Sequence, residues 1–266
     1  MDQDRLESAL AELPLGAVRF YEQIGSTNVA ALSWAEAGCP NLSLVVADEQ
    51  TAGRGRGDRR WYTPPGSALA FSLILKDIAQ GSRSAHLTGL GGLAVSYALE
   101  DLYALPTQVK WPNDVLVAGK KLAGVLVEAQ WSGERLKRVV LGMGINVSPT
   151  SVPEAERLDF PATCVESALG RKVERWELLS AVLAEALEWR ERLGTPEFVQ
   201  AWEAKLAYLG NWVQAIPDSE SPLKGQLVGL TPDGGLRIRP HTGEERVLRF
   251  GEIRLRLLTD YKNTLN

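Results

Sequence analysis

Gly53-Arg54-Gly55-Arg56-Gly57 is the most distinctive stretch of the sequence, and it lies in an organising region that runs from Ala47 to Lys121. Apolar and β-branched residues at 42–47 predict a buried strand before it. After it, Pro64-Pro65-Gly66 forbids a helix, and residues 69–75 predict a second strand. The stretch is therefore predicted to be a strand-to-strand loop. Its glycines would let backbone N–H groups approach an anion, and its guanidinium groups would fit phosphate or carboxylate oxygens. A solvated, merely flexible basic loop is an equally open interpretation of these residues alone.

A second motif follows in two apolar segments, 109–117 and 120–128, which are joined by a tight turn. This pattern predicts a β-hairpin. The hairpin would carry Asn113, Asp114 and Lys121 on one patch of the sheet. An amide, a carboxylate and a lysine together are suited to handling phosphates and a metal ion.

Taken together, these motifs resemble the biotin protein ligase family, also called biotin–[carboxylase] ligases. The resemblance covers residues 20–150 firmly and the remainder loosely, and five motifs in one order are far more specific than any one of them. The motifs are Ser26-Thr27-Asn28, Gln50 to Arg56, Lys110 to Asp114, Lys121 to Gly124, and Gly142 to Asn146.

The resemblance implies an α+β fold, with a mixed β-sheet and helices like those of class II aminoacyl-tRNA synthetases, followed by a small C-terminal SH3-like β-barrel. The residues themselves predict five short strands between Trp212 and Leu258, a spacing typical of a small barrel. A helix is predicted from Pro196 through Leu209, capped by Gly210. We place the division near Asn211, with a catalytic domain at 1–210 and a barrel domain at 211–266.

The start of the chain offers a helix over 29–37, for which Ser26 and Thr27 are ordinary N-cap residues. In the family this element also lines the biotin pocket, and both interpretations can hold. A longer amphipathic helix is predicted over 84–102.

The activity that the resemblance implies has two steps. The biotin carboxylate attacks the α-phosphate of ATP and gives biotinyl-5′-AMP and pyrophosphate. The ε-amine of one lysine on a biotin carboxyl carrier protein then attacks this mixed anhydride and releases AMP. The implied small molecules are ATP, Mg²⁺ and biotin.

The implied catalytic residues are Lys121, Arg54 and Asp114, with Lys121 bridging the biotin carboxylate and the α-phosphate. Asp114 stays open between a base, a metal ligand and a structural residue. Trp61 would pack beside the adenylate, or it is an ordinary core tryptophan. The other residues implied to bind biotin, nucleotide or metal are Ser26, Thr27, Asn28, Gln50, Gly53, Arg56, Asn113, Gly124 and Asn146.

Three other functions fit the residues less well. A lipoate ligase would carry Arg-Arg-x-x-Gly-Gly-Gly, whereas here Arg59-Arg60 is followed by Trp61-Tyr62. A dinucleotide oxidoreductase needs Gly-x-Gly-x-x-Gly opening a helix, which residues 53–57 do not supply. A non-enzymatic RNA-binding module fits poorly with the acidic balance of the chain.

The composition bounds the remaining expectations. The chain has 266 residues, 45% of them hydrophobic, a formal net charge of −4, two cysteines and two histidines. These values argue against a general nucleic-acid binder, a disulfide framework, a His triad and a zinc site. No signal peptide or membrane span is visible, so a cytoplasmic protein is expected. The 25 residues before Ser26 are too few for the family's DNA-binding domain, so the monofunctional form without DNA is expected. The oligomeric state stays open, a homodimer included.

Overall fold

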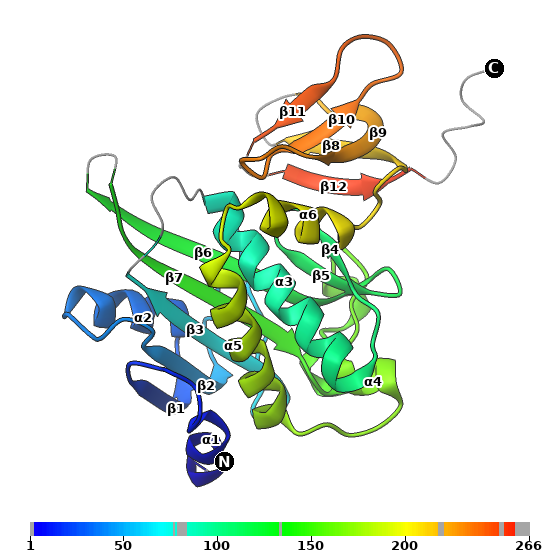
Figure 1. Cartoon of the computed structure of the whole chain (residues 1–266). Helices are drawn as coiled ribbons and strands as arrows, with labels where there is room; N and C mark the ends of the chain where they lie inside the picture. The colour runs from blue at the N-terminus through cyan, green and yellow to red at the C-terminus, as the bar shows by residue number, and fades with distance from the viewer. Residues whose placement is uncertain are drawn as a thin grey trace.

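The computed structural model describes residues 3–76, 78, 84–132, 135–217, 221–249 and 253–258. Two sheets organise them (Figure 1). The larger has seven strands in the order β1-β2-β3-β7-β6-β5-β4. The larger sheet consists of β1 Val18–Ile24, β2 Leu44–Gln50, β3 Ala68–Leu75, β4 Gln108–Lys110, β5 Asp114–Val117, β6 Lys120–Ser132 and β7 Arg135–Asn146.

The sheet is mixed, because β1 and β2 are parallel while the other neighbouring pairs are antiparallel. The predicted hairpin is confirmed between β5 and β6, but its first arm was wrong as a single strand. Residues 109–117 turn back at 111–113, so that β4 and β5 are separate antiparallel strands. In the turn between β5 and β6, Ala118 and Gly119 have φ of 47° and 73°. This positive φ at both positions is the backbone that a two-residue hairpin requires.

Helices cover both faces of the larger sheet. The helices are α1 Gln3–Leu10, α2 Thr27–Glu36, α3 Ser84–Tyr103, α4 Val165–Leu169, α5 Arg175–Glu191 and α6 Pro196–Ala204, with short 3₁₀ turns at Pro149–Ser151 and Ala155–Arg157. No helix in the described part of the chain is long and apolar enough to cross a membrane.

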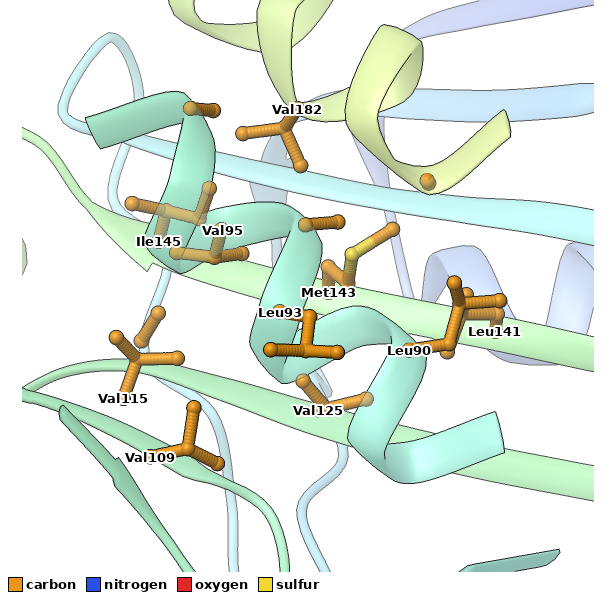
Figure 2. Packing of buried hydrophobic residues seen from close by; sticks show 14 of the residues in the cluster. Leu90, Leu93, Val95, Val109, Val115, Val125, Leu141, Met143, Ile145 and Val182 are labelled. Carbon is orange, nitrogen blue, oxygen red and sulfur yellow. The ribbon is translucent and has the colours of Figure 1, made fainter. Parts of the chain in front are cut away.

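The main core lies between the sheet and α3, which α5 covers in turn. Figure 2 shows the α3 residues Leu90, Leu93 and Val95 against the strand residues Val125, Leu141, Met143 and Ile145. These strand residues alternate along β6 and β7, so their neighbours Gly124, Gly142, Gly144 and Asn146 face the other side. That second face carries α2, and it leaves room for a site.

The second sheet lies beside α6 (Figure 1) and is antiparallel, with the order β11-β10-β9-β8-β12. A small C-terminal barrel of the SH3-like type fits this sheet. Its strands are β8 Trp212–Pro217, β9 Leu223–Leu230, β10 Leu236–Arg239, β11 Arg246–Leu248 and β12 Ile253–Leu257. The division into domains 1–210 and 211–266 stays a prediction, and residues 218–220, 250–252 and 259–266 lie outside the described part.

Polar contacts attach this sheet to α6 and to the turn between β4 and β5. Trp111 Nε1 donates a hydrogen bond to Gly234 O at 3.1 Å, and Leu230 N donates one to the carboxylate of Glu203 at 2.6 Å. Trp111 comes directly before the Pro-Asn-Asp part of the second motif. The second sheet therefore contacts the segment that carries Asn113 and Asp114.

The prediction of a helix from Pro196 to Leu209 was wrong at its end. Helix α6 stops at Ala204, because the next residues pair with strand β4 instead. Val109 N donates a hydrogen bond to Lys205 O at 2.7 Å, and Ala207 N donates one to Val109 O at 2.9 Å. Pairing with a sheet edge replaced the last helical turn, and local periodicity cannot show such a long-range contact.

Candidate active site

A cavity of about 370 Å³ opens on the sheet face that carries Gly124 and Gly144. Strand β12 of the second sheet forms part of its wall through Arg254 and Arg256. Twelve of the thirteen residues that the sequence predicted for the site line this cavity: Ser26, Thr27, Asn28, Gln50, Arg54, Arg56, Trp61, Asn113, Asp114, Lys121, Gly124 and Asn146. Gly53 is the predicted residue that does not line it.

One row across the sheet explains why motifs far apart in sequence meet here. The strand registers pair Ala70 with Gly144, Gly144 with Gly124, Gly124 with Asp114, and Asp114 with Lys110. Residues paired in this way across strands point to the same face of a sheet. The row therefore has small residues at its centre, which form a flat floor, and a carboxylate and a lysine at its end.

The indole of Trp61 lies on this floor. A Cβ on Gly144 would lie 2.3 Å from Trp61 Cε2, and one on Gly124 would lie 3.2 Å from Trp61 Cζ3. The ring is half-buried and lines the cavity, and its Nε1 is buried without a hydrogen-bond partner among the described residues. A side chain at 144 would therefore displace the ring.

The glycine-arginine loop forms a small hairpin of its own. Trp61 N donates a hydrogen bond to Gly53 O at 2.9 Å, and Gly55 N donates one to Arg59 O at 2.8 Å. A Cβ on Gly53 would lie 2.4 Å from Trp61 O, so this glycine permits the close backbone pairing that places Trp61. Gly53 thus shapes the loop without lining the cavity.

Arg54, Arg56, Arg59 and Arg60 of the loop all line the cavity, and the first two have partners on or next to the sheet. Arg54 Nη1 donates a hydrogen bond to Glu128 Oε1 at 2.8 Å, and Arg56 Nη1 donates one to Asn113 Oδ1 at 3.3 Å. These contacts hold the loop against β6 and the start of β5.

The start of α2 supplies further polar groups to the cavity wall. Thr27 N donates to Gln50 Oε1 at 2.8 Å, and Gln50 Nε2 donates to Thr63 Oγ1 at 3.1 Å. Ser26 occupies the predicted N-cap position, but its side chain makes no capping hydrogen bond. Gln50 therefore satisfies an N–H group at the start of the helix.

Asp114 lies between two lysines. Lys121 Nζ lies 2.6 Å from Asp114 Oδ1, at angles outside those of a hydrogen bond, and Lys110 Nζ lies 4.0 Å from Asp114 Oδ2. The backbone of Lys121 is fixed on its other side, because Lys121 N donates to Pro161 O and Thr163 N donates to Lys121 O, both at 2.8 Å. The site thus presents a positioned lysine next to a carboxylate.

Lys110 belongs to the second motif, but its role as a buried cation was missed. Its side chain is 6% exposed, and its Nζ lies 3.8 Å from the centre of the Phe160 ring. Burial lowers the pKa of Lys110 to about 8; Asp114 opposes this shift, and Arg256 and Lys121 add to it. Near neutral pH the lysine is thus a cation that an anionic ligand would stabilise.

The amides of Asn113 and Asn146 make structural contacts at the cavity wall. Asn113 Nδ2 donates to Val125 O at 3.1 Å, which joins β6 to the start of β5. Asn146 Nδ2 donates to Thr163 O at 3.0 Å and so holds the segment that leads into α4. Both side chains line the cavity and could also meet a ligand.

Within the described part of the chain, the acidic, histidine and cysteine side chains do not form a metal site by themselves. No group of three or more His, Cys, Asp or Glu side chains in the described ranges could hold a metal ion. Asp114 is already paired with Lys121, whereas Mg²⁺ prefers about six oxygen ligands and keeps several waters. Asp114 as a metal ligand stays a prediction.

Known proteins share this arrangement of sequence and fold. Residues 20–146 match the model of the Biotin/lipoate A/B protein ligase family. A biotin–[acetyl-CoA-carboxylase] ligase from Paracoccus denitrificans is 33% identical over 229 residues, which cover 83% of this chain and 93% of that protein. The chain belongs to the biotin protein ligase family.

Two further similarities within the biotin protein ligase family extend over nearly the whole chain. The biotin protein ligase from Aquifex aeolicus in complex with biotin and ATP superposes with a TM-score of 0.79 and 32% identity, covering 91% of this chain and 99% of that one. The bifunctional ligase/repressor BirA of Bacillus subtilis (strain 168) is 31% identical over 232 residues, which cover 86% of this chain and 71% of that protein.

Proposed function

We propose that this chain activates biotin with ATP and transfers it to one lysine of a biotin carboxyl carrier protein. The chain is an enzyme of the ligase class, as its family membership shows. One observation supports the site proposal most strongly. Arg54, Arg56 and Lys121 line a single cavity together with the polar side chains of Thr27 and Gln50.

The first half-reaction would join two anions. A biotin carboxylate oxygen attacks the α-phosphorus of ATP, and pyrophosphate leaves. Cations positioned where charge develops stabilise such a transition state, and we assign this role to Lys121 and Arg54. ATP would bring Mg²⁺ as part of the substrate, with phosphate oxygens and water as the metal's ligands.

We assign biotin to the end of the cavity formed by the start of α2. Ser26, Thr27, Gln50 and Gly124 would contact it, and Gly53 would act by shaping the loop. Asn28 would line this end of the cavity, and Trp61 would pack against the adenylate from its place on the sheet floor. Asn113 and Asn146 would border the nucleotide.

The second half-reaction would form the amide bond. The lysine nitrogen attacks the carbonyl carbon of the anhydride, AMP leaves, and the amine loses a proton. Free lysine has a pKa of about 10.4, so little of it is a nucleophile at neutral pH. We assign the acceptance of this proton to Asp114. A cytoplasmic location, the absence of DNA binding and a homodimer stay predictions.

A biotin-dependent ATP–pyrophosphate exchange assay tests the first half-reaction, and it needs no acceptor protein. We expect exchange with biotin and none with lipoate or octanoate. Exchange with lipoate or octanoate in place of biotin would overturn the assignment, because the matched family model includes lipoate ligases.

A further inference from the structure

The carboxylate of Glu128 connects the loop to the start of α2. Its Oε1 accepts a hydrogen bond from Arg54 Nη1 at 2.8 Å, and its Oε2 accepts one from Asn28 Nδ2 at 2.9 Å. The Glu128 side chain is 20% exposed, whereas that of Arg54 is 48% exposed. Arg54 lines the cavity and Glu128 does not. The carboxylate therefore joins two residues that line the cavity, Arg54 and Asn28, without lining it itself.

Asn28 is itself fixed by buried neighbours. Its Oδ1 accepts a hydrogen bond from Ser72 Oγ at 2.6 Å, and Ser72 is fully buried. Its amide also fills the space beside Gly142, where a Cβ would lie 2.0 Å from Asn28 Oδ1. The amide thus has little freedom to turn, and its Nδ2 donates in a fixed direction. Glu128 is thereby held in place before any ligand arrives.

We infer that Glu128 is a positioning residue, which acts through Arg54 to hold the loop ready for an anion. This inference rests on the proposed function and adds to it a residue that does not touch the substrate. A guanidinium carries five N–H donors, so one contact with Glu128 leaves donors for a carboxylate or phosphate in the cavity. Holding the arginine in advance lowers the cost of ordering it when the ligand binds.

The substitution Glu128→Gln removes the charge and one of the two acceptors. The glutamine oxygen can accept a hydrogen bond from Asn28 or from Arg54 but not from both, and the ion pair with Arg54 is lost in either orientation. A partly exposed ion pair is worth roughly a two- to fivefold change in an equilibrium. We therefore expect the KM for biotin and the dissociation rate of biotinyl-5′-AMP to rise by that factor, with an unchanged melting temperature. Glu49→Gln is the matched control, because Glu49 accepts a hydrogen bond from the exposed Gln23; it should keep the parent values.

A double-mutant cycle distinguishes this role from a general structural one. If Glu128 acts through Arg54, Glu128→Gln should add nothing once Arg54→Gln is present. Equal losses from Glu128→Gln with and without Arg54 would overturn the inference, as would parent values in the single variant.

Amide hydrogen exchange tests the inference even if the proposed function fails. In the ligand-free enzyme, the amides of Gly55 and Trp61 should exchange faster in Glu128→Gln than in the parent or in Glu49→Gln. Unchanged exchange at both amides would show that Glu128 does not hold the loop. Absence of biotin-dependent exchange of pyrophosphate in the parent would instead count against the function alone.

Discussion

Substituting Gly144 by alanine should weaken ligand binding more than it weakens the fold. The new Cβ would lie 2.3 Å from Trp61 Cε2 and 2.4 Å from Trp61 Nε1. Ordinary contact begins at 3.4 Å, so the ring would have to retreat by about 1 Å. Trp61 is half-buried and sits at the end of the loop hairpin, so ring and loop can move away together in the free enzyme.

If the ligand binds only when the ring lies on the sheet floor, the clash destabilises the bound state and leaves the free enzyme unaffected. Overpacking costs about 1–3 kcal/mol, which corresponds to roughly a 5- to 150-fold rise in the dissociation constant. Biotin and adenylate binding can be measured by titration calorimetry, and the fold by thermal unfolding. Gly25→Ala is a suitable control, because a Cβ there meets nothing within 4 Å. Unchanged affinity together with a lowered unfolding free energy would refute this reasoning, because Trp61 would then stabilise the fold without contributing to ligand binding.

Four further predictions follow from the same site. Lys121→Ala should reduce pyrophosphate exchange by roughly a hundred- to a thousandfold at an unchanged melting temperature, because one positioned donor is worth about 3–4 kcal/mol; near-normal exchange would remove its role. Asp114→Asn should slow transfer from preformed adenylate more than adenylate synthesis, and equal losses would point to a structural or metal role. Arg56→Gly should still form adenylate but release it, seen by chromatography and by stray labelling of bystander protein; full retention would show that the loop is no lid. The KM for ATP should rise above about pH 8 as Lys110 loses its proton, and Lys110→Arg, which stays charged, should flatten that rise; equal pH profiles would exclude this cause.

The sign of the Lys110 effect on stability follows from its lowered pKa. Unfolding restores an ordinary lysine pKa of about 10.4, so the unfolded chain binds the proton more readily than the folded chain. Lys110 therefore costs no stability above about pH 10.4, and the folded state loses stability as the pH falls from there towards about 8. Below that value the cost stays constant, and an anion in the cavity would offset it.

Local sequence signals were enough for most elements of the larger sheet and for the α2 and α3 helices. Strand alternation, the proline-glycine stop after the loop and the hairpin turn each depend on neighbouring residues alone. The end of α6 was missed, because Lys205 and Ala207 pair with Val109, almost a hundred residues away. The apolar periodicity of residues 196–209 does not reveal such a long-range pairing, so the end of the helix could not be predicted from it.

The site was predicted through its motifs, but the supporting residues behind it were not. Glu128 lies two and four residues beyond Leu126 and Gly124 on the same strand, and this alternation places all three on one face. That signal could have identified Glu128, had the face of Gly124 been followed along the strand. Ser72 and Arg256 offered no such signal, because their places depend on the register of β3 and on the docking of β12.

The central claim is that this cavity makes and then consumes biotinyl-5′-AMP. The most direct test forms the adenylate on the enzyme from biotin and ATP, removes free nucleotide, and adds a purified carrier domain. We predict that AMP is released in step with one biotin on the carrier lysine, and that a carrier with arginine at that lysine leaves the adenylate bound. Adenylate that never forms, or carrier labelling that proceeds equally with the arginine variant, would contradict the claim.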